Sequence, residues 1–375
     1  MSGNIGANPF MKILHLQLLP LLSGVQRVTL NEILDFKDKS DYEFHVYCNS
    51  EGPLTEYLVN IGTHYEIVDS LKREISLLDD FKSLIELIKK IRKNKFDVVH
   101  THSSKTGVLG RLAAKICGVG NIVHTVHGYS FPAAKNKKQY YTFFFMEYIS
   151  KFFTDKLIVL NKEDYDISIN KLGYSKDKVK LVANAIDTTK FYPITKANDH
   201  REVKIVMVGR LWEQKNPMCL LEAFLKLNPD LNCRLDFIGD GEFREQIEKI
   251  ISTNNKSESV RVLGWKDNVH DLLRDYDIFV LPSLWEGMPL AILEAQASGL
   301  PCVVSDIPGN NNLVLDSENG FLFKPNDASD LKEKLSILIN NETLRTNMSY
   351  RAREIIENSY SMSKRRSSIE AIYNN

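Results

Sequence analysis

Two glutamates eight residues apart stand in a pattern that suits a polyhydroxylated, anionic ligand. Glu286 follows a short apolar run, Ile278–Leu281, and a Pro-Ser break. Glu294 falls within the helix predicted around Pro289, a residue that a first helical turn accepts. Free N–H groups at a helix start can hold an anion, and a carboxylate can accept hydrogen bonds from two neighbouring sugar hydroxyls. A pair of surface glutamates is the usual interpretation, but this context favours a sugar-nucleotide site.

Two cations occupy a comparable position earlier in the chain. Arg210 and Lys215 lie in the segment GRLWEQKNP, which follows the apolar run Val203–Val208 and precedes a helix predicted near Asn216. Solvated loop cations are the commoner outcome for such a pair. However, open α/β sheets bind ligands at the carboxyl ends of their strands. We therefore predict that both cations and the helix start bind a diphosphate without a metal.

Short apolar strands alternate with amphipathic helices, which predicts parallel sheets covered on both faces. In the first half the expected strands are Met11–Leu18, Glu43–Tyr47, Tyr65–Val68, Asp97–Thr101, Ile122–Val126, Leu157–Leu160 and Val179–Val182. In the second half they are Val203–Val208, Leu235–Ile238, Val260–Leu263, Ile278–Leu281, Cys302–Ser305 and Phe321–Phe323. A polar stretch separates the two series. The predicted parts are a first domain at 11–187, a linker at 188–201, a second domain at 202–355 and a C-terminal helix at 356–375 that could return to the first domain.

The composition indicates a globular protein and excludes some function classes. A chain of 375 residues exceeds what one hydrophobic core usually supports. Lys+Arg and Asp+Glu both number 48, so no global basic field argues for nucleic acid. The five cysteines form no close pair, which favours reduced thiols in the cytoplasm. We expect neither a signal peptide nor a membrane span, because no apolar stretch approaches about 20 residues.

Six segments in the second half occur in a fixed order: NAID, GRLWEQKNP, FIGDGEFREQIE, VRVLGWKDNVHDLL, PSLWEGMPLAILEAQASGLP and PGNNNLVLDSENGFLF. Together they resemble the retaining, metal-independent glycosyltransferases of family 4, and the resemblance extends over residues 11–375. It implies the GT-B fold, in which two Rossmann-like domains face each other across a cleft. One Glu-x7-Glu pattern is weak evidence alone, whereas six motifs in family order are specific.

The resemblance implies a role for each matching residue of the second domain. The donor diphosphate would be bound by Arg210 and Lys215, and the ribose by Glu294. The base would meet the backbone of Leu263, Gly264 and Trp265. The donor sugar and its β-phosphate would contact Glu286 and the amides of Gly287, Met288, Pro289 and Leu290.

In the first domain, His127 lies at the end of a predicted strand. A lone histidine there is more often structural, but the family has an active-site histidine at this strand end, so the catalytic candidates are His127 and Glu286. His102 ends the preceding strand and either lines the acceptor side or packs. Gly24 would allow the backbone to approach the donor near its diphosphate, although Ser23 stands where many relatives have glycine.

The resemblance also implies a mechanism and partners. Glu286 is the only carboxylate that the motifs place near the reacting carbon, so retention fits front-face attack, with the leaving diphosphate taking the acceptor proton. We expect no metal or cofactor, because the nucleotide-sugar, a UDP-sugar, is a substrate. The expected acceptor is a polyprenyl-diphosphate-linked saccharide, as in lipopolysaccharide or capsule synthesis.

The segment at 135–153 combines four lysines with eight aromatic residues. A core helix could bury one face formed by Tyr141, Phe144, Phe145, Tyr148 and Phe152. Aromatics all around the helix and flanking lysines instead predict an interfacial element on anionic lipid. We therefore expect peripheral association with the inner face of the cell membrane.

Other enzyme classes fit the residues less well. A sugar-nucleotide epimerase or a non-catalytic GT-B subunit could share the architecture, but the acceptor-side motifs argue against the first and the complete donor set against the second. The segment GDGEFR lacks the third glycine of a nicotinamide-binding fingerprint. A metal-dependent GT-A transferase would need an Asp-x-Asp after a strand, whereas Asp275-Tyr276-Asp277 precedes one.

Overall fold

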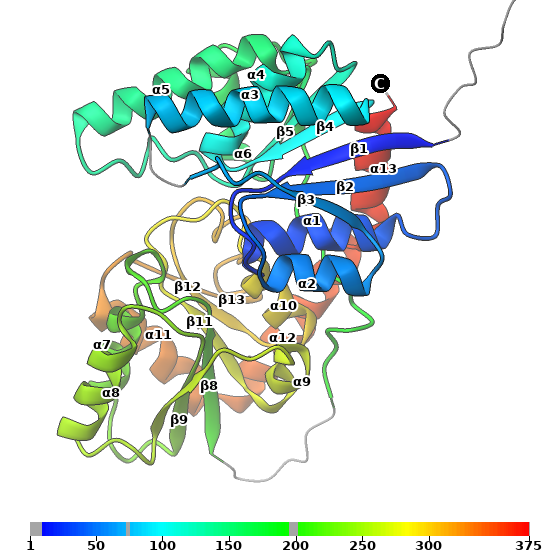
Figure 1. The fold of residues 1–375 in the computed structure, drawn as a ribbon. Coiled ribbons are helices and arrows are strands. Elements are labelled where there is room, and N and C mark those ends of the chain that lie inside the picture. Colours follow the sequence, from blue (N-terminus) through cyan, green and yellow to red (C-terminus); the bar gives the residue numbers. More distant parts are fainter. Residues whose placement is uncertain (1–9, 73–75, 195–201, 375) are drawn as a thin grey trace, which may run out of the picture. The chain divides into compact units, whose positions relative to one another are not determined.

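The computed structural model describes residues 10–72, 76–194 and 202–374. The chain divides into two compact units (Figure 1). The first unit contains the residues up to Ala183 and those from Arg365 onward, whereas the second contains Asn184–Lys364. The C-terminal segment from Arg365 is therefore part of the first unit.

The second unit begins before the linker that the sequence placed at 188–201. Ile186 forms a β-bridge with Ser361, and the Asn184 side-chain amide donates a hydrogen bond to the Met288 carbonyl oxygen at 2.9 Å. These contacts place residues 184–187 in the second unit, whereas the sequence assigned them to the first domain. Residues 195–201 of the expected linker lie outside the described part of the chain.

The first unit alternates strands with helices along the chain. Its strands are β1 (Met11–Leu16), β2 (Tyr42–Cys48), β3 (His64–Ile67), β4 (Val98–His102), β5 (Asn121–Val126), β6 (Lys156–Val159) and β7 (Val179–Leu181). Its helices are α1 (Gly24–Asp35), α2 (Pro53–Asn60), α3 (Leu77–Asn94), α4 (Ser104–Ile116), α5 (Lys137–Ser150), the 3-10 turn η1 (Lys151–Phe153), α6 (Lys162–Asn170) and α13 (Met362–Tyr373).

These strands form one parallel, 7-stranded sheet in the order β3-β2-β1-β4-β5-β6-β7. The winding direction reverses between β1 and β4, and in such sheets the loops after these two strands leave room for a ligand. The register pairs His15 of β1 with His100 of β4. Two histidines therefore lie side by side on the two strands between which the winding reverses.

Helix α13 packs on this sheet. Its residues Ile369, Ile372 and Tyr373 share a buried cluster with Ile13 of β1 and Val98 of β4. Figure 1 shows the helix beside these strands. Burial of this apolar face joins the end of the chain to the first unit.

The second unit has the same alternation. Its strands are β8 (Val203–Val208), β9 (Cys233–Ile238), β10 (Val260–Gly264), β11 (Ile278–Leu281), β12 (Cys302–Ser305) and β13 (Gly320–Phe323). Its helices are α7 (Pro217–Leu225), α8 (Arg244–Thr253), α9 (Val269–Leu272), α10 (Leu290–Ala297), α11 (Ala328–Asn340) and α12 (Glu342–Ser359), with the 3-10 turns η2 (Glu213–Lys215) and η3 (Leu273–Asp275).

The second sheet is parallel and 6-stranded, in the order β10-β9-β8-β11-β12-β13. Its winding direction reverses between β8 and β11. Strand β8 is largely buried, and all four residues of β11 are buried. Strands covered on both faces are continuous apolar runs, and each strand that these runs predicted is present in the structure. Across the described helices, none combines the length and hydropathy that a membrane crossing requires.

Candidate active site

The loops after β8 and β11 meet at the point where the second sheet reverses direction. The Leu284 N–H donates to the Gln214 carbonyl oxygen at 2.8 Å. The Gln214 side-chain amide donates to the Trp285 carbonyl oxygen at 3.0 Å. Reciprocal bonds of this kind fix one loop against the other, so the side chains that both loops present keep a defined geometry.

Lys215 and Glu286, one from each loop, form an ion pair. Lys215 Nζ lies 2.5 Å from Glu286 Oε1, and Ser283 Oγ donates to the same oxygen at 2.7 Å. The lysine side chain is 14% exposed and the glutamate side chain 8%. The sequence assigned these residues to neighbouring parts of one ligand, and the structure brings their charges into direct contact.

Arg210 is the second cation of the β8 loop. Its guanidinium carbon lies 4.4 Å from the ring centre of Trp212, and Nη2 lies 3.5 Å from Gln214 Oε1. In general, a guanidinium that stacks on an aromatic ring can bind a planar or tetrahedral anion through its N–H groups. Arg210 and Lys215 thus occupy the same loop at the carboxyl end of β8.

The donor-sugar loop leads into α10. Helix α10 begins at Leu290, with Pro289 as the N-cap, so the proline precedes the first turn and does not lie within it. Met288, Pro289 and Leu290 are buried, and the Met288 carbonyl oxygen accepts a hydrogen bond from the Asn184 side chain. Gly309 (φ +89°) packs against this loop, because an added Cβ would lie 2.6 Å from the Gly287 carbonyl oxygen.

The remaining second-unit candidates occupy two places. Glu294 lies within α10 and is 8% exposed. Leu263 and Gly264 end β10, where the Gly239 N–H donates to the Gly264 carbonyl oxygen at 2.9 Å. Trp265 follows and is 49% exposed. The base-binding candidates therefore lie at the end of β10, and the ribose-binding candidate lies on α10, the helix that follows β11.

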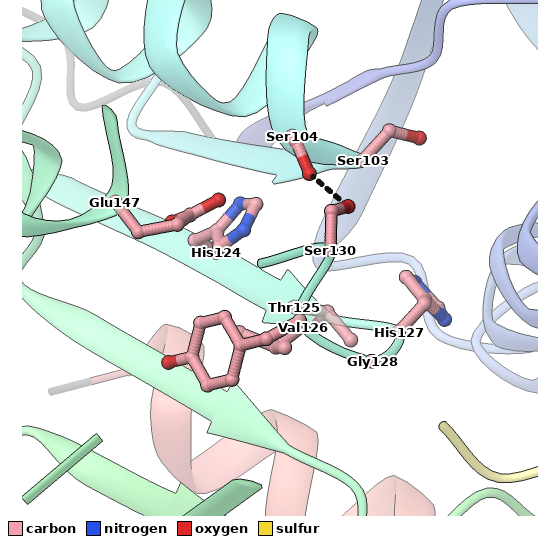
Figure 2. A pocket seen from close by; sticks show the side chains of 10 residues that line it. Ser103, Ser104, His124, Thr125, Val126, His127, Gly128, Ser130 and Glu147 are labelled. Atoms are coloured by element: carbon pink, nitrogen blue, oxygen red, sulfur yellow. Dashed lines mark hydrogen bonds between the residues drawn. The ribbon is translucent and has the colours of Figure 1, made fainter. Parts of the chain in front are cut away.

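In the first unit, His127 follows β5 and borders a pocket of about 200 Å³ (Figure 2). The pocket also meets Ser104 and Ser130, whose hydroxyls lie 3.1 Å apart. Burial, followed by the nearby Arg365 and His100, lowers the pKa of His127 to about 3. A neutral imidazole at physiological pH can both donate and accept one hydrogen bond.

The other first-unit candidates divide into buried and open positions. His102, left open by the sequence, is buried behind His127, with His102 Nδ1 and His127 Nε2 3.1 Å apart. His100 and His124 are also buried. Gly24 is the first residue of α1, and an added Cβ there would meet no atom within 4 Å. Protein packing does not require a glycine at position 24.

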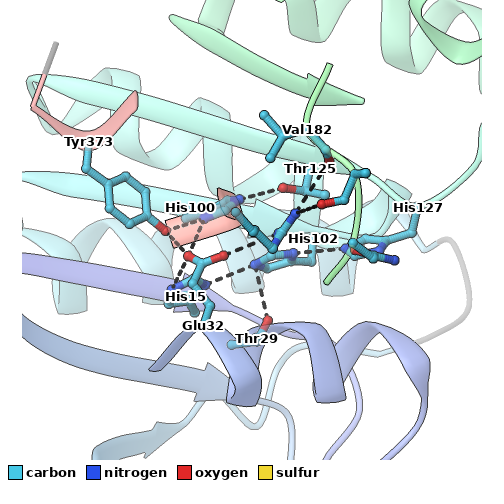
Figure 3. Close-up of polar contacts among 12 residues, drawn as sticks. His15, Thr29, Glu32, His100, His102, Thr125, His127, Val182 and Tyr373 are labelled. Atoms are coloured by element: carbon cyan, nitrogen blue, oxygen red, sulfur yellow. Dashed lines mark hydrogen bonds and ion pairs between the residues drawn. The ribbon is translucent and has the colours of Figure 1, made fainter. Parts of the chain in front are cut away.

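The first unit also contains a buried polar cluster that the sequence did not predict. It comprises His15 of β1, Glu32 of α1, and Arg365 and Tyr373 of α13, together with the histidines of β4 (Figure 3). Glu32 and Tyr373 are 341 positions apart. The only local signal was a histidine within an otherwise apolar run at His15, which is also a common core arrangement.

Two family models match the chain in succession. The model of Glycosyltransferase Family 4 matches residues 22–190, and the model of Glycosyl transferases group 1 matches residues 190–355.

Known proteins match over nearly the whole chain. It is 41% identical over 377 residues to the UDP-Gal:alpha-D-GlcNAc-diphosphoundecaprenol alpha-1,3-galactosyltransferase of Escherichia coli, covering 97% of this chain and 96% of that protein. It is 25% identical over 382 residues to the capsular polysaccharide biosynthesis glycosyltransferase CapM of Staphylococcus aureus, covering 97% of each. The crystal structure of Anabaena HepE with UDP and glucose has a TM-score of 0.82 at 18% identity, covering 97% of this chain and 99% of that one, which shows a shared fold. The chain therefore belongs to the family-4 glycosyltransferases, with the GT-B fold.

Proposed function

We propose that this glycosyltransferase moves a hexosyl group from a UDP-sugar to a saccharide on a polyprenyl diphosphate, in the synthesis of a surface polysaccharide such as lipopolysaccharide or capsule. The observation that carries this proposal is 41% identity, over 97% of the chain, to a galactosyltransferase named for UDP-Gal and a GlcNAc-diphosphoundecaprenol acceptor. UDP-galactose and GlcNAc-diphosphoundecaprenol are therefore the first donor and acceptor to test.

The donor diphosphate is proposed to bind at the carboxyl end of β8. Arg210 and Lys215 supply positive charge there, and the first N–H groups of α10 add a partial positive charge. Glu294 would hold the ribose, and the backbone at Leu263–Trp265 the base. These groups can offset the diphosphate without a metal ion.

Transfer is proposed to occur with retention, by attack on the face that the diphosphate leaves. The acceptor oxygen bonds to the anomeric carbon as the bond to the diphosphate oxygen breaks, and that oxygen takes the acceptor proton. Lys215 and Arg210 would stabilise the charge that develops on the leaving group. Glu286, held by Lys215 and Ser283, and the backbone of Gly287–Leu290 would orient the donor sugar. Neutral His127 would hydrogen-bond a substrate hydroxyl.

Purified protein is expected to galactosylate GlcNAc-diphosphoundecaprenol from UDP-galactose at an unchanged rate in EDTA. The product linkage should be α by NMR, because retention keeps the α configuration of the donor. A donor incubated without acceptor should stay unaltered, which distinguishes transfer from epimerisation. Complete loss of activity in EDTA that Mg²⁺ restores, or a β-linked product, would contradict the proposed donor site or mechanism.

A lipid-linked acceptor requires the enzyme to reach a membrane surface, and we propose that α5 provides the contact. Tyr140, Phe143 and Phe144 pack against the core cluster of β5 and β6. Exposed apolar side chains cover the other side of α5 and η1: Tyr141 (55%), Phe145 (55%), Tyr148 (36%), Ile149 (51%) and Phe152 (63%). The face that a core helix would have buried is thus largely exposed, which favours the interfacial interpretation.

Replacing Phe145 and Phe152 with serine is expected to reduce co-sedimentation with phosphatidylglycerol-containing vesicles by at least about tenfold, since each aromatic that inserts contributes on the order of 1–2 kcal/mol. Changing Lys135, Lys137 and Lys138 to glutamate should have a similar, salt-dependent effect, at about 1 kcal/mol for each lysine near the surface.

The matched control replaces Val59 of α2 and Tyr350 of α12, which are 60% and 74% exposed, with serine. This variant should sediment like the unmodified protein. Equal vesicle binding by all variants would show that the aromatic face of α5 does not contact lipid.

A further inference from the structure

A buried row of side chains runs through the first unit from Glu32 to His127 (Figure 3). His15 Nε2 lies 3.5 Å from Glu32 Oε1, and His15 Nδ1 lies 3.0 Å from His102 Nε2. His102 Nδ1 then lies 3.1 Å from His127 Nε2. Glu32, His15 and His102 are each at most 4% exposed, whereas His127 borders the pocket. The row therefore connects a buried carboxylate to the expected reaction side of this unit.

Glu32 is ionised in these surroundings. Burial alone would raise its pKa, but the neighbouring His100, His15 and Arg365 hold the pKa well below its ordinary value. Tyr373 donates a hydrogen bond to Oε1, and Arg365 Nη2 lies 3.5 Å from Oε2. Helix α13 thus supplies two of the groups that keep the negative charge in place.

The carboxylate determines which nitrogen of His15 carries the proton. A lone pair at Nε2 would point at a buried anion, whereas an N–H at Nε2 is attracted by it. Burial lowers the pKa of His15 to about 3, so the ring is neutral and has a single N–H. With that N–H at Nε2, His15 Nδ1 is a hydrogen-bond acceptor.

The direction of hydrogen-bond donation is then the same at each contact of the row. His102 must donate from Nε2 to His15 Nδ1, and burial places the pKa of His102 well below its ordinary value, so its Nδ1 is an acceptor. His127 must then donate from Nε2 to His102 Nδ1, and its lone pair is left at Nδ1. Thr29 Oγ1, 3.3 Å from His102 Nε2, is a hydroxyl that can donate or accept and so does not reverse this order.

We propose that Glu32 sets the tautomer of His127 through His15 and His102, so that His127 offers Nδ1 as a hydrogen-bond acceptor to a hydroxyl of the bound substrate. Glu32, His15 and His102 are positioning residues in this arrangement, because none of them meets the substrate. The proposal rests on the proposed function only in assigning the substrate hydroxyl; the tautomer itself is a property of the free protein.

Metal binding is the other chemistry that three neighbouring histidines suggest. Ligand atoms of His15, His100 and His102 lie within 4.8 Å of one another. However, His15 Nδ1 and His102 Nε2 already face each other at 3.0 Å as a hydrogen-bonded pair, which uses a nitrogen of each ring. His100 is also engaged at both nitrogens, by Tyr373 at 2.6 Å and Thr125 at 2.7 Å. The hydrogen-bonded row accounts for the cluster better.

The tautomer can be measured directly by NMR of the full-length protein labelled with ¹⁵N-histidine, with the His127 signals assigned by a His127→Asn variant. In the unmodified protein, His127 should carry its proton on Nε2. Glu32→Gln removes the negative charge, 3.5 Å away, that attracts an N–H at His15 Nε2, and the introduced amide can turn its NH₂ group toward that nitrogen. The hydrogen bonds between the histidines should then reverse, and His127 should carry its proton on Nδ1. The control Asp35→Asn removes a carboxylate of the same helix that pairs with Arg366, and it should leave the tautomer unchanged.

Transfer activity separates this inference from the proposed function. Glu32→Gln should lower kcat roughly 10-fold, the size expected for the loss of one hydrogen bond to the substrate, with the affinity for UDP unchanged by calorimetry. A reversed tautomer with normal kcat would support the row and remove His127 from the proposed reaction. An Nδ1-protonated His127 in the unmodified protein, or an unchanged tautomer in folded Glu32→Gln, would overturn the proposal. The tautomer of the unmodified protein tests the proposal even if the Glu32→Gln variant does not fold.

Discussion

Replacing Lys215 with methionine is expected to lower both the stability of the second unit and its affinity for UDP. The change leaves Glu286, whose side chain is 8% exposed, without its cation at 2.5 Å. An uncompensated, largely buried carboxylate costs about 2–3 kcal/mol of unfolding free energy. Loss of a charge-assisted bond to the diphosphate should weaken UDP binding by about 10- to 100-fold.

A double variant separates these two effects. Lys215→Met with Glu286→Gln removes both charges, and the introduced amide oxygen can still accept the hydrogen bond from Ser283. Chemical denaturation should show most of the lost stability restored, whereas calorimetry should show UDP affinity still reduced. Wild-type UDP affinity in the double variant would show that Lys215 does not bind the diphosphate. Unchanged stability of the single variant would show that the ion pair does not stabilise the fold.

Acidification from pH 8 to pH 5 is expected to destabilise the first unit by at least about 3–4 kcal/mol, which is the part that His15 and His127 contribute. His15 and His127 each have a pKa lowered to about 3 from 6.5, chiefly by burial. Below pH 6.5 the unfolded chain therefore binds protons that the folded unit does not bind until about pH 3. Stability falls across that interval, at about 1.4 kcal/mol for each pH unit and each fully buried group, with a discount for the partly exposed His127.

Other buried groups of the first unit change its stability in the same direction. Burial also lowers the pKa of His102 and of His124, which adds to the loss. Glu32 adds to the loss of stability only below pH 4.5, the pKa of a glutamate in the unfolded chain, because its pKa in the folded unit is lowered. The measurement is the unfolding free energy against pH by urea denaturation, with His15→Asn expected to flatten the slope. A free energy constant between pH 8 and pH 5 would show that these histidines are not held neutral.

Local sequence was sufficient to predict the strands and the loops of the candidate site. Strands buried on both faces are apolar runs such as Ile278–Leu281, and these runs gave each strand of both sheets. Arg210 and Lys215 follow one run, and Glu286 follows another. Because parallel strands end at the same edge of a sheet, these loops could be assigned to the ligand edge before the structure was known.

The contacts between the loops could not be predicted in this way. Lys215 and Glu286 are 71 positions apart and meet because β8 and β11 are neighbours in the sheet. For the same reason the sequence could not predict the buried row that ends at His127, because β1, α1, β4 and α13 each contribute a side chain to this region. Sequence spacing records positions along the chain, whereas these contacts depend on which strands pair.

Helix α5 separates what the sequence determines from what the tertiary structure determines. The sequence alone determined that aromatic residues surround this helix and that lysines flank it, and its motifs predicted a family-4 glycosyltransferase. Which aromatics face outward was decided by packing: Tyr140, Phe143 and Phe144 contact the core, whereas Tyr141 and Phe145 are exposed. With apolar side chains all around, a helix has no preferred buried face of its own, so only its docking against β5 and β6 selects one.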